Sequence, residues 1–214
     1  LWLNANLKSI YCMKSLNIAL AAVAALLASC GTPKGNNTQG PMNKPFLELA
    51  EARYSVRQYA KTPVEQEKID CILEAAKLAP TAKNLQPQFI YVLKSAEAIA
   101  KVNQVSSCAY NAPVVFIVCY DKDTAWKNPL NGDRSSGEMD ASIVGTHMML
   151  EAASQGLGTC WVGWFDPAAV SKAFDIPDNL YPAFMLDCGY PADGSKPSPR
   201  HYASKEISDF VKEL

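Results

Sequence analysis

Residues 137–165, GEMDASIVGTHMMLEAASQGLGTCWVGWF, carry the main structural signal of the chain. Residues 137–157 predict a long helix, and apolar side chains cover nearly all sides of its middle, so the helix is buried all round or forms an interface. Gly156 and Gly158 suit the end of that helix, where glycine often terminates the regular backbone. The segment up to Phe165 holds small residues that let a flat ligand approach the backbone, and two tryptophans that can wall a pocket. Its alternative interpretation is an ordinary core strand.

Outward from this stretch, helices and strands mix along the chain. Helices are expected at 46–53, at 62–80 (with Thr62 as cap and Pro63 in the first turn), at 96–102 and after Asp166-Pro167. Strands are expected at 88–93, 114–120 and 183–190, and a polar loop at 121–137. A heavy helical share with few strands predicts an α+β fold.

The composition is that of a globular domain. The chain has 214 residues, 49% of them apolar and 19% charged, which suits one domain with a tail. The formal net charge is −1 and no block of like charges occurs, so the sequence predicts no nucleic-acid partner. Seven cysteines occur without a Cys-x-x-Cys pair, and no acidic set has ligand spacing, so no metal site is predicted.

The first thirty residues differ in kind from the rest. An apolar run at 18–28 is too short to span a bilayer but fits a secretory signal. Leu27-Ala28-Ser29-Cys30 closes it and resembles the lipobox of bacterial lipoproteins, which implies lipidation of Cys30, a membrane attachment and a cell-envelope location. We therefore expect upstream residues and a signal peptide at 1–29, a flexible tether at 30–45 and the folded domain at 46–214. The alternative is a buried N-terminal helix.

The cysteines of the expected domain predict buried free thiols rather than a disulfide framework, because their number is odd and most have apolar neighbours. They are Cys71, Cys108, Cys119, Cys160 and Cys188. One alternative is a thiol enzyme in which Cys160 is the nucleophile and His147 the base, but nothing near either residue favours that pairing.

Two further segments carry polar side chains suited to a ligand. Arg53 and Arg57, with the Ser55 hydroxyl between them, offer a fork of donors that suits a phosphate. The alternative is a solvated face. The loop at 79–88, APTAKNLQPQ, carries amides that can read a heteroaromatic edge, or it is an ordinary turn between prolines.

In combination and in this order, the three segments resemble the FMN-dependent nitroreductase family. The motifs are Arg-x-Ser-x-Arg at 53–57, Ala-Pro-Thr-Ala-x-Asn-x-Gln-Pro at 79–87 and Gly-Leu-Gly-Thr-Cys-Trp-Val-Gly at 156–163. Gly-Tyr-Pro-Ala at 189–192 and the Ala112-Pro113 pair before an apolar strand add to the resemblance. It covers the whole expected domain, residues 46–214.

The resemblance implies an intertwined α+β homodimer with a central, mostly antiparallel sheet flanked by helices and FMN bound between the subunits. The cofactor-binding residues it implies are Arg53, Tyr54, Ser55 and Arg57, a tail contact from Arg200, Val162, Gly163 and Trp164 along the ring, and Pro80, Thr81, Ala82 and Asn84 from the partner subunit. No protein group is implied as a general acid or base, because the flavin carries the chemistry.

The reaction implied is a ping-pong one. NADH or NADPH reduces FMN, and a small electron acceptor (a nitroaromatic, a quinone or an activated alkene) then takes the electrons. Gly163 stands where many relatives have an acidic residue, and Gln88 where an aromatic residue often follows Gln-Pro. NAD(P)H is not expected to be abundant outside the cytoplasm, so either the lipobox is misread, the electron donor differs or a membrane carrier supplies the reductant. A separate alternative is a non-catalytic flavin-binding or flavin-carrier lipoprotein.

Overall fold

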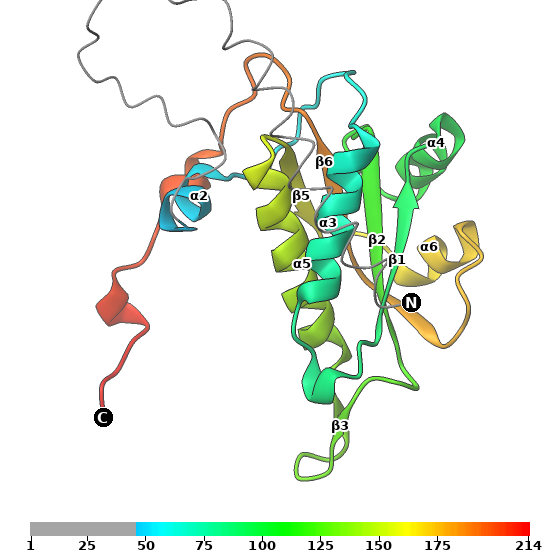
Figure 1. Ribbon diagram of the computed structural model, residues 1–214, viewed down its shortest axis with the longest axis vertical. Helices are drawn as coiled ribbons and strands as arrows, with labels where there is room; N and C mark the ends of the chain where they lie inside the picture. Colours follow the sequence, from blue (N-terminus) through cyan, green and yellow to red (C-terminus); the bar gives the residue numbers. More distant parts are fainter. Residues whose placement is uncertain (1–45) are drawn as a thin grey trace, which may run out of the picture. The chain divides into compact units, whose positions relative to one another are not determined.

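The structure, a computed structural model, describes residues 46–214, and its centre is one antiparallel sheet of four strands (Figure 1). The strands are β1 (Gln88–Leu93), β2 (Val114–Asp121), β5 (Gly158–Val162) and β6 (Leu180–Gly189), in the order β1-β2-β6-β5. All three strand pairs are antiparallel, and the β2–β6 register shifts between Val118 and Cys119. The central position of β2 and β6 explains why both read as almost continuous apolar runs.

Two long helices cover one face of the sheet. They are α3 (Gln66–Leu78) and α5 (Gly137–Ser154), which pack against each other and against the sheet. The core between them and the sheet is formed by Ile69, Ile72, Ala76, Val144, Met148, Phe116, Phe184 and Leu186, among others. The burial of apolar side chains in this layer stabilises the fold.

Two shorter helices, α4 (Ala96–Val105) and α6 (Pro167–Ala173), lie on the opposite face. Ser95 caps α4 by accepting a hydrogen bond from the Ala98 N–H, and Asp166 caps α6 through the Ala168 N–H. The second core layer holds Val102, Val115, Ile117, Cys160, Val162, Val170 and Met185. The sheet is therefore buried on both faces.

The remaining elements are short. They are α2 (Phe46–Ala52), the 3-10 turns η1 (Ala82–Asn84), η2 (Pro199–Tyr202) and η3 (Ile207–Asp209), and the two-residue strands β3 (Lys127–Asn128) and β4 (Arg134–Ser135). The C-terminal residues run away from the sheet as an arm (Figure 1). Among the helices of residues 46–214, none is long and apolar enough to cross a membrane.

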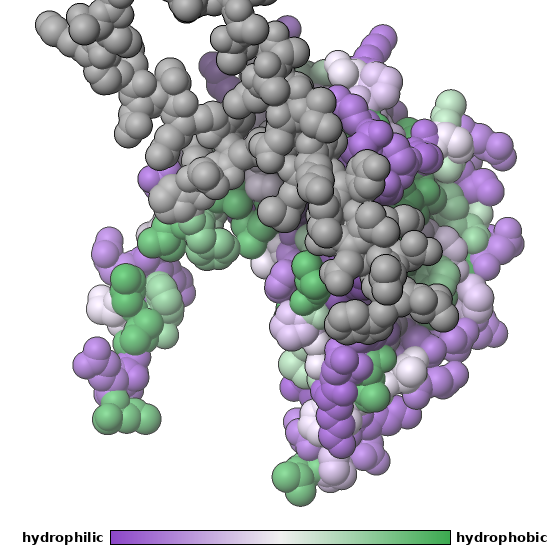
Figure 2. Space-filling view, in the orientation of Figure 1, coloured by the Kyte–Doolittle hydropathy of each residue, from purple (hydrophilic) through white to green (hydrophobic). Residues whose placement is uncertain are grey.

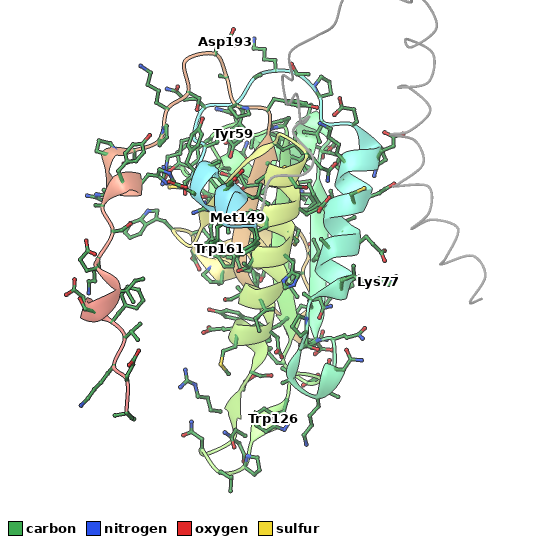
Figure 3. The ribbon with its side chains drawn as sticks, turned by 60° about the vertical axis from the view of Figure 1, so that its left-hand side comes forward. Tyr59, Lys77, Trp126, Met149, Trp161 and Asp193 are labelled. Atoms are coloured by element: carbon green, nitrogen blue, oxygen red, sulfur yellow. The ribbon has the colours of Figure 1, made fainter. Side chains whose placement is uncertain are left out.

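The close packing of α5 on the sheet depends on Gly145. A Cβ placed there would lie 2.3 Å from Phe184 and 2.6 Å from Trp161. Those two rings stack on each other across β5 and β6, with centroids 3.6 Å apart and planes at 15°. The absence of a side chain at Gly145 lets α5 pack directly against this aromatic pair. Trp161 is labelled in Figure 3.

The α+β class predicted from the sequence is confirmed, as are strands at 88–93, 114–120 and 183–190, with small differences at their ends. The predicted start of α3 is wrong. Thr62 and Pro63 do not begin the helix, because Glu65 is extended and its carboxylate accepts a hydrogen bond from the Tyr190 hydroxyl at 2.8 Å. The loop at 121–137 contains the small β3–β4 hairpin, which was not expected. The expectations for residues 1–45, including Cys30, lie outside the described residues.

Candidate functional site

The segment Arg53–Arg57 runs beside the sheet rather than into solvent. Ser55 forms a parallel bridge with Thr159, the second residue of β5. The Val56 N–H donates to the Thr159 carbonyl oxygen at 2.9 Å, and the Val56 side chain is buried. These contacts fix the backbone, so the side chains of Arg53, Ser55 and Arg57 are held in one short extended stretch.

The C-terminal tail meets the same stretch. The Tyr54 hydroxyl lies 3.3 Å from both the carbonyl oxygen and the hydroxyl of Ser195. The Tyr54 ring also faces the edge of the His201 ring, with centroids 6.4 Å apart. Arg200, the neighbour of His201 in η2, is thereby brought to the side of the domain that holds Arg53 and Arg57. We call Arg53, Ser55, Arg57 and Arg200 the arginine group.

The arginine group carries unneutralised positive charge. Within residues 46–214 none of its three arginines forms an ion pair with a carboxylate. Arg57 is exposed, and its recorded hydrogen bond goes to the Ser55 carbonyl oxygen at 3.1 Å. Guanidinium groups and a hydroxyl without an acidic partner are the donors that a phosphate ester prefers. The phosphate-binding role predicted for these residues fits their chemistry.

The end of β5 offers an open stretch of backbone. Val162 is buried, while a Cβ added at Gly163 would meet no atom within 4 Å. Trp164 follows and is 80% exposed, and its carbonyl oxygen accepts a hydrogen bond from the Ser106 hydroxyl at 3.4 Å. A flat ring could therefore lie against the Gly163 backbone without a clash, beside an indole available for stacking.

The predicted loop Pro80–Asn84 lies at the other end of α5. The Ala82 N–H donates to Asp140 in the first turn of that helix, whereas Thr159 follows its last turn. With 18 residues, α5 is roughly 27 Å long. Figure 3 shows the same separation. Tyr59, two residues after Arg57, lies towards one end of the domain, and Trp126, whose ring lies beneath Lys83 of the loop, lies towards the other. One chain therefore does not bring this loop to its own arginine group.

A buried carboxyl group that was not predicted from the sequence lies behind the arginine group. Asp187 is 0% exposed, and neither oxygen has a hydrogen-bond partner among the described residues. It faces Cys160 across the β5–β6 pair. Burial raises the pKa of Asp187 to about 8, so this side chain carries a proton over much of the neutral range.

The groups around Asp187 are also held in their neutral forms. Burial, helped by Asp187 and opposed by Arg57, raises the pKa of the Cys160 thiol to about 11. Burial first, and then the charge of Asp187, raises the pKa of Tyr59, whose hydroxyl donates to the Val56 carbonyl oxygen at 2.8 Å. Because a buried charge is costly, the side chains of Asp187, Cys160 and Tyr59 favour their uncharged forms.

The thiol alternative finds no support in the geometry. A thiol with a pKa of about 11 is scarcely ionised near neutrality, and the thiolate is the nucleophile. His147 Nδ1 instead lies 2.9 Å from the Ile143 carbonyl oxygen of its own helix. Cys108, Cys119, Cys160 and Cys188 are free, as predicted. Cys71 is not one of these free thiols, which corrects the prediction for that residue.

Comparison with known proteins identifies the family to which this fold belongs. The pattern of the nitroreductase family matches residues 50–110 and 106–190, and the chain belongs to that family. It is therefore an oxidoreductase fold of known type, with the expected antiparallel sheet flanked by helices.

Individual relatives agree with this assignment. A candidate NADH dehydrogenase/NAD(P)H nitroreductase of Methanothermobacter thermautotrophicus is 31% identical over 154 residues, which cover 69% of this chain and 78% of that protein. The crystal structure of a nitroreductase family protein from Clostridium difficile 630 is 38% identical with a TM-score of 0.74, covering 79% of this chain and 98% of that one. A candidate nitroreductase from Exiguobacterium sibiricum, solved in complex with FMN, shares the fold at 21% identity and a TM-score of 0.69, covering 81% and 99%.

Proposed function

We propose that this protein is an FMN-dependent oxidoreductase that uses NADH or NADPH to reduce small acceptors in a ping-pong cycle. The observation that carries the proposal is the arginine group, whose three arginines form no ion pair among the described residues. Its members lie on the 53–57 segment, which bridges to β5, and on the tail, which contacts Tyr54. The open backbone at Gly163 gives room for a ring system. The relatives named for NAD(P)H, and the neighbour solved with FMN, support the same cofactor and donor.

Each part of the chain has a distinct task in this proposal. FMN, when bound, supplies the chemistry: it accepts a hydride from the nicotinamide and gives electrons to a nitroaromatic, quinone or activated alkene. Arg53, Ser55, Arg57 and Arg200 bind the phosphate and the ribityl chain, with Tyr54 contributing through its backbone. Val162, Gly163 and Trp164 orient the ring and leave one side open to the donor and the acceptor.

The proposed enzyme is a homodimer. The loop Pro80–Asn84, with Thr81, Ala82 and Asn84, lies too far along α5 to serve its own arginine group, so a second copy completes the site. Apolar surface suited to such a contact is exposed on three elements. Its members are Phe46 and Leu47 on α2, Met139 and Ile143 on α5, and Ile207, Phe210 and Val211 on the C-terminal arm. Figure 2 shows apolar surface on α2 and on the arm.

A lipid anchor at Cys30 is proposed as the means of attachment to the cell envelope, on the basis of the sequence at 27–30. Labelling of the expressed protein with a radioactive fatty acid, followed by membrane fractionation, tests it. We expect label and membrane association in the wild type and neither in Cys30→Ser. An unlabelled wild type would contradict the anchor and the envelope location.

An anaerobic titration tests the enzymatic function. The protein is loaded with FMN, freed of excess and titrated with NADH and, separately, with NADPH while the flavin absorbance is followed. We expect bleaching by one or both donors and recovery of the oxidised spectrum on adding a quinone or a nitroaromatic. Bound FMN that neither donor reduces would favour the flavin-carrier alternative. A protein that binds no FMN would refute the proposal.

A further inference from the structure

The loop between α3 and β1 has an unusual backbone for its sequence. Lys83, Asn84 and Gln86 all have positive φ, at 51°, 55° and 50°. None of them is glycine, and L residues adopt this left-handed region at a cost. Such a run persists only where surrounding contacts hold it, and residues held in this way are concentrated at functional sites.

Most of the polar contacts of this loop are internal. The Gln86 N–H donates to the Thr81 hydroxyl at 3.0 Å, and the Gln86 side-chain amide donates to Asn84 Oδ1 at 2.9 Å. Lys83 also lies over the Trp126 ring, 5.7 Å from its centroid. Among residues 46–214, the only recorded hydrogen bond from 81–86 to another element is the one from the Ala82 N–H.

That hydrogen bond ends on a buried acid. Asp140 is 3% exposed, and its Oδ1 accepts from the Ala82 N–H at 2.9 Å. Its Oδ2 accepts from the Ser136 hydroxyl at 2.7 Å. The Ser136 N–H in turn donates to the Trp126 carbonyl oxygen at 2.8 Å, which connects the start of α5 to the loop at 121–137. Both oxygens of Asp140 are satisfied, each by a different loop.

We propose that Asp140 is the positioning residue of the loop 81–86: its carboxyl group holds the Ala82 N–H and so fixes the loop in the shape that presents it to the cofactor of the second copy. This inference rests on the proposed function, in which Thr81, Ala82 and Asn84 serve that site. Asp140 itself does not touch the cofactor. The geometry separates its two contacts, because one goes to the loop 81–86 and the other to Ser136, the residue immediately before α5.

This separation supplies matched variants. Asp140→Ala removes both contacts. Asp140→Asn keeps an oxygen that can face Ala82 and an amide group that can donate to Ser136. Ser136→Ala removes only the contact to Oδ2 and leaves the bond to Ala82. Ala82→Pro removes the donor from the loop side and leaves α5 unchanged; the extended backbone of Thr81 accommodates a following proline.

Two measurements are made on the full chain. Hydrogen exchange of peptides covering 81–87 is compared with peptides from β2, first without FMN, and FMN affinity is then measured by quenching of flavin fluorescence. We expect Asp140→Ala and Ala82→Pro to raise exchange in 81–87 alone and to weaken FMN binding about tenfold. Asp140→Asn and Ser136→Ala should stay within about threefold of the wild type.

The outcomes separate the inference from the function. Unchanged exchange in 81–87 or unchanged FMN affinity in Asp140→Ala would overturn the positioning role, as would an Asn variant that behaves like the Ala variant or a Ser136→Ala variant that loses binding. If Asp140→Ala does not fold, Ala82→Pro decides by the same two criteria. A wild type that binds no FMN refutes the proposed function instead, and the exchange measurement still tests whether Asp140 fixes the loop.

Discussion

Replacement of Asp187 by Asn should make the protein more stable in mild alkali than the wild type. Asp187 is 0% exposed and has no hydrogen-bond partner among the described residues, and its burial raises its pKa from the ordinary 3.8 to about 8. The folded state therefore keeps a proton that the unfolded state gives up. Asparagine has nearly the same shape as the protonated acid and carries no charge at any pH.

The sign and size follow from proton linkage. Because the folded-state pKa is the higher one, the contribution of Asp187 to stability is fully present below about pH 4 and is lost as the pH rises to about 8. At about 1.4 kcal/mol per pH unit, the whole loss is roughly 6 kcal/mol. Between about pH 5.5 and about pH 8 the loss amounts to roughly 3 kcal/mol.

Urea unfolding followed by far-UV circular dichroism at a series of pH values measures this. The free energy of unfolding of the wild type minus that of Asp187→Asn should fall steadily with rising pH, because other titrating groups cancel in the difference. Asp178→Asn, the same substitution at an exposed position, is the matched control. Parallel curves for the wild type and Asp187→Asn would refute the assignment of a protonated, unsolvated carboxyl group.

Three other changes have definite expectations. Gly145→Ala should lower the free energy of unfolding, measured by urea unfolding, by about 1–3 kcal/mol, because the added methyl group meets Phe184 and Trp161. Ser142→Ala, on the exposed side of the same helix, should change that free energy little. Arg57→Ala should weaken FMN binding by about 1.5–3 kcal/mol through loss of a charge-assisted contact, and an unchanged dissociation constant would count against the phosphate assignment. Cys160→Ser should keep nicotinamide-dependent reduction of the flavin within about threefold in stopped-flow measurements, while abolished reduction would revive the thiol hypothesis.

The sequence predicted the elements of the fold better than their ends. Alternation and apolar runs located β1, β2 and β6, because these signals report burial directly. The start of α3 failed because Thr62-Pro63-Val64-Glu65 has local capping chemistry, while the carboxylate of Glu65 is engaged by Tyr190, a residue distant in sequence. A tertiary contact of this kind overrides a local preference and leaves no local sign.

In the candidate site, too, some features could be predicted from the sequence and others could not. The types and spacing of Arg53, Ser55 and Arg57 were sufficient to suggest an anion site, because charge and hydrogen-bonding capacity are properties of the residues themselves. The positioning role proposed for Asp140 could not be predicted from the sequence, because its partner is the backbone N–H of Ala82, and almost every residue has such a group. The burial of Asp187 could have been inferred from the sequence, because side chains alternate along the strand and Asp187 shares a face with Met185, inside the core.

The contact between Tyr54 and Ser195, 141 residues apart in sequence, has a consequence for how the candidate site is assembled. The last strand of the sheet ends at Gly189, so the sheet can close before the tail is in place. The arginine group draws on both segments, which are joined next to β6 by the bridge between Tyr59 and Pro191. If the arginine group binds the FMN phosphate as proposed, cleavage of the tail after Ser195 would separate Arg200 from the other members of the group without removing any strand of the sheet.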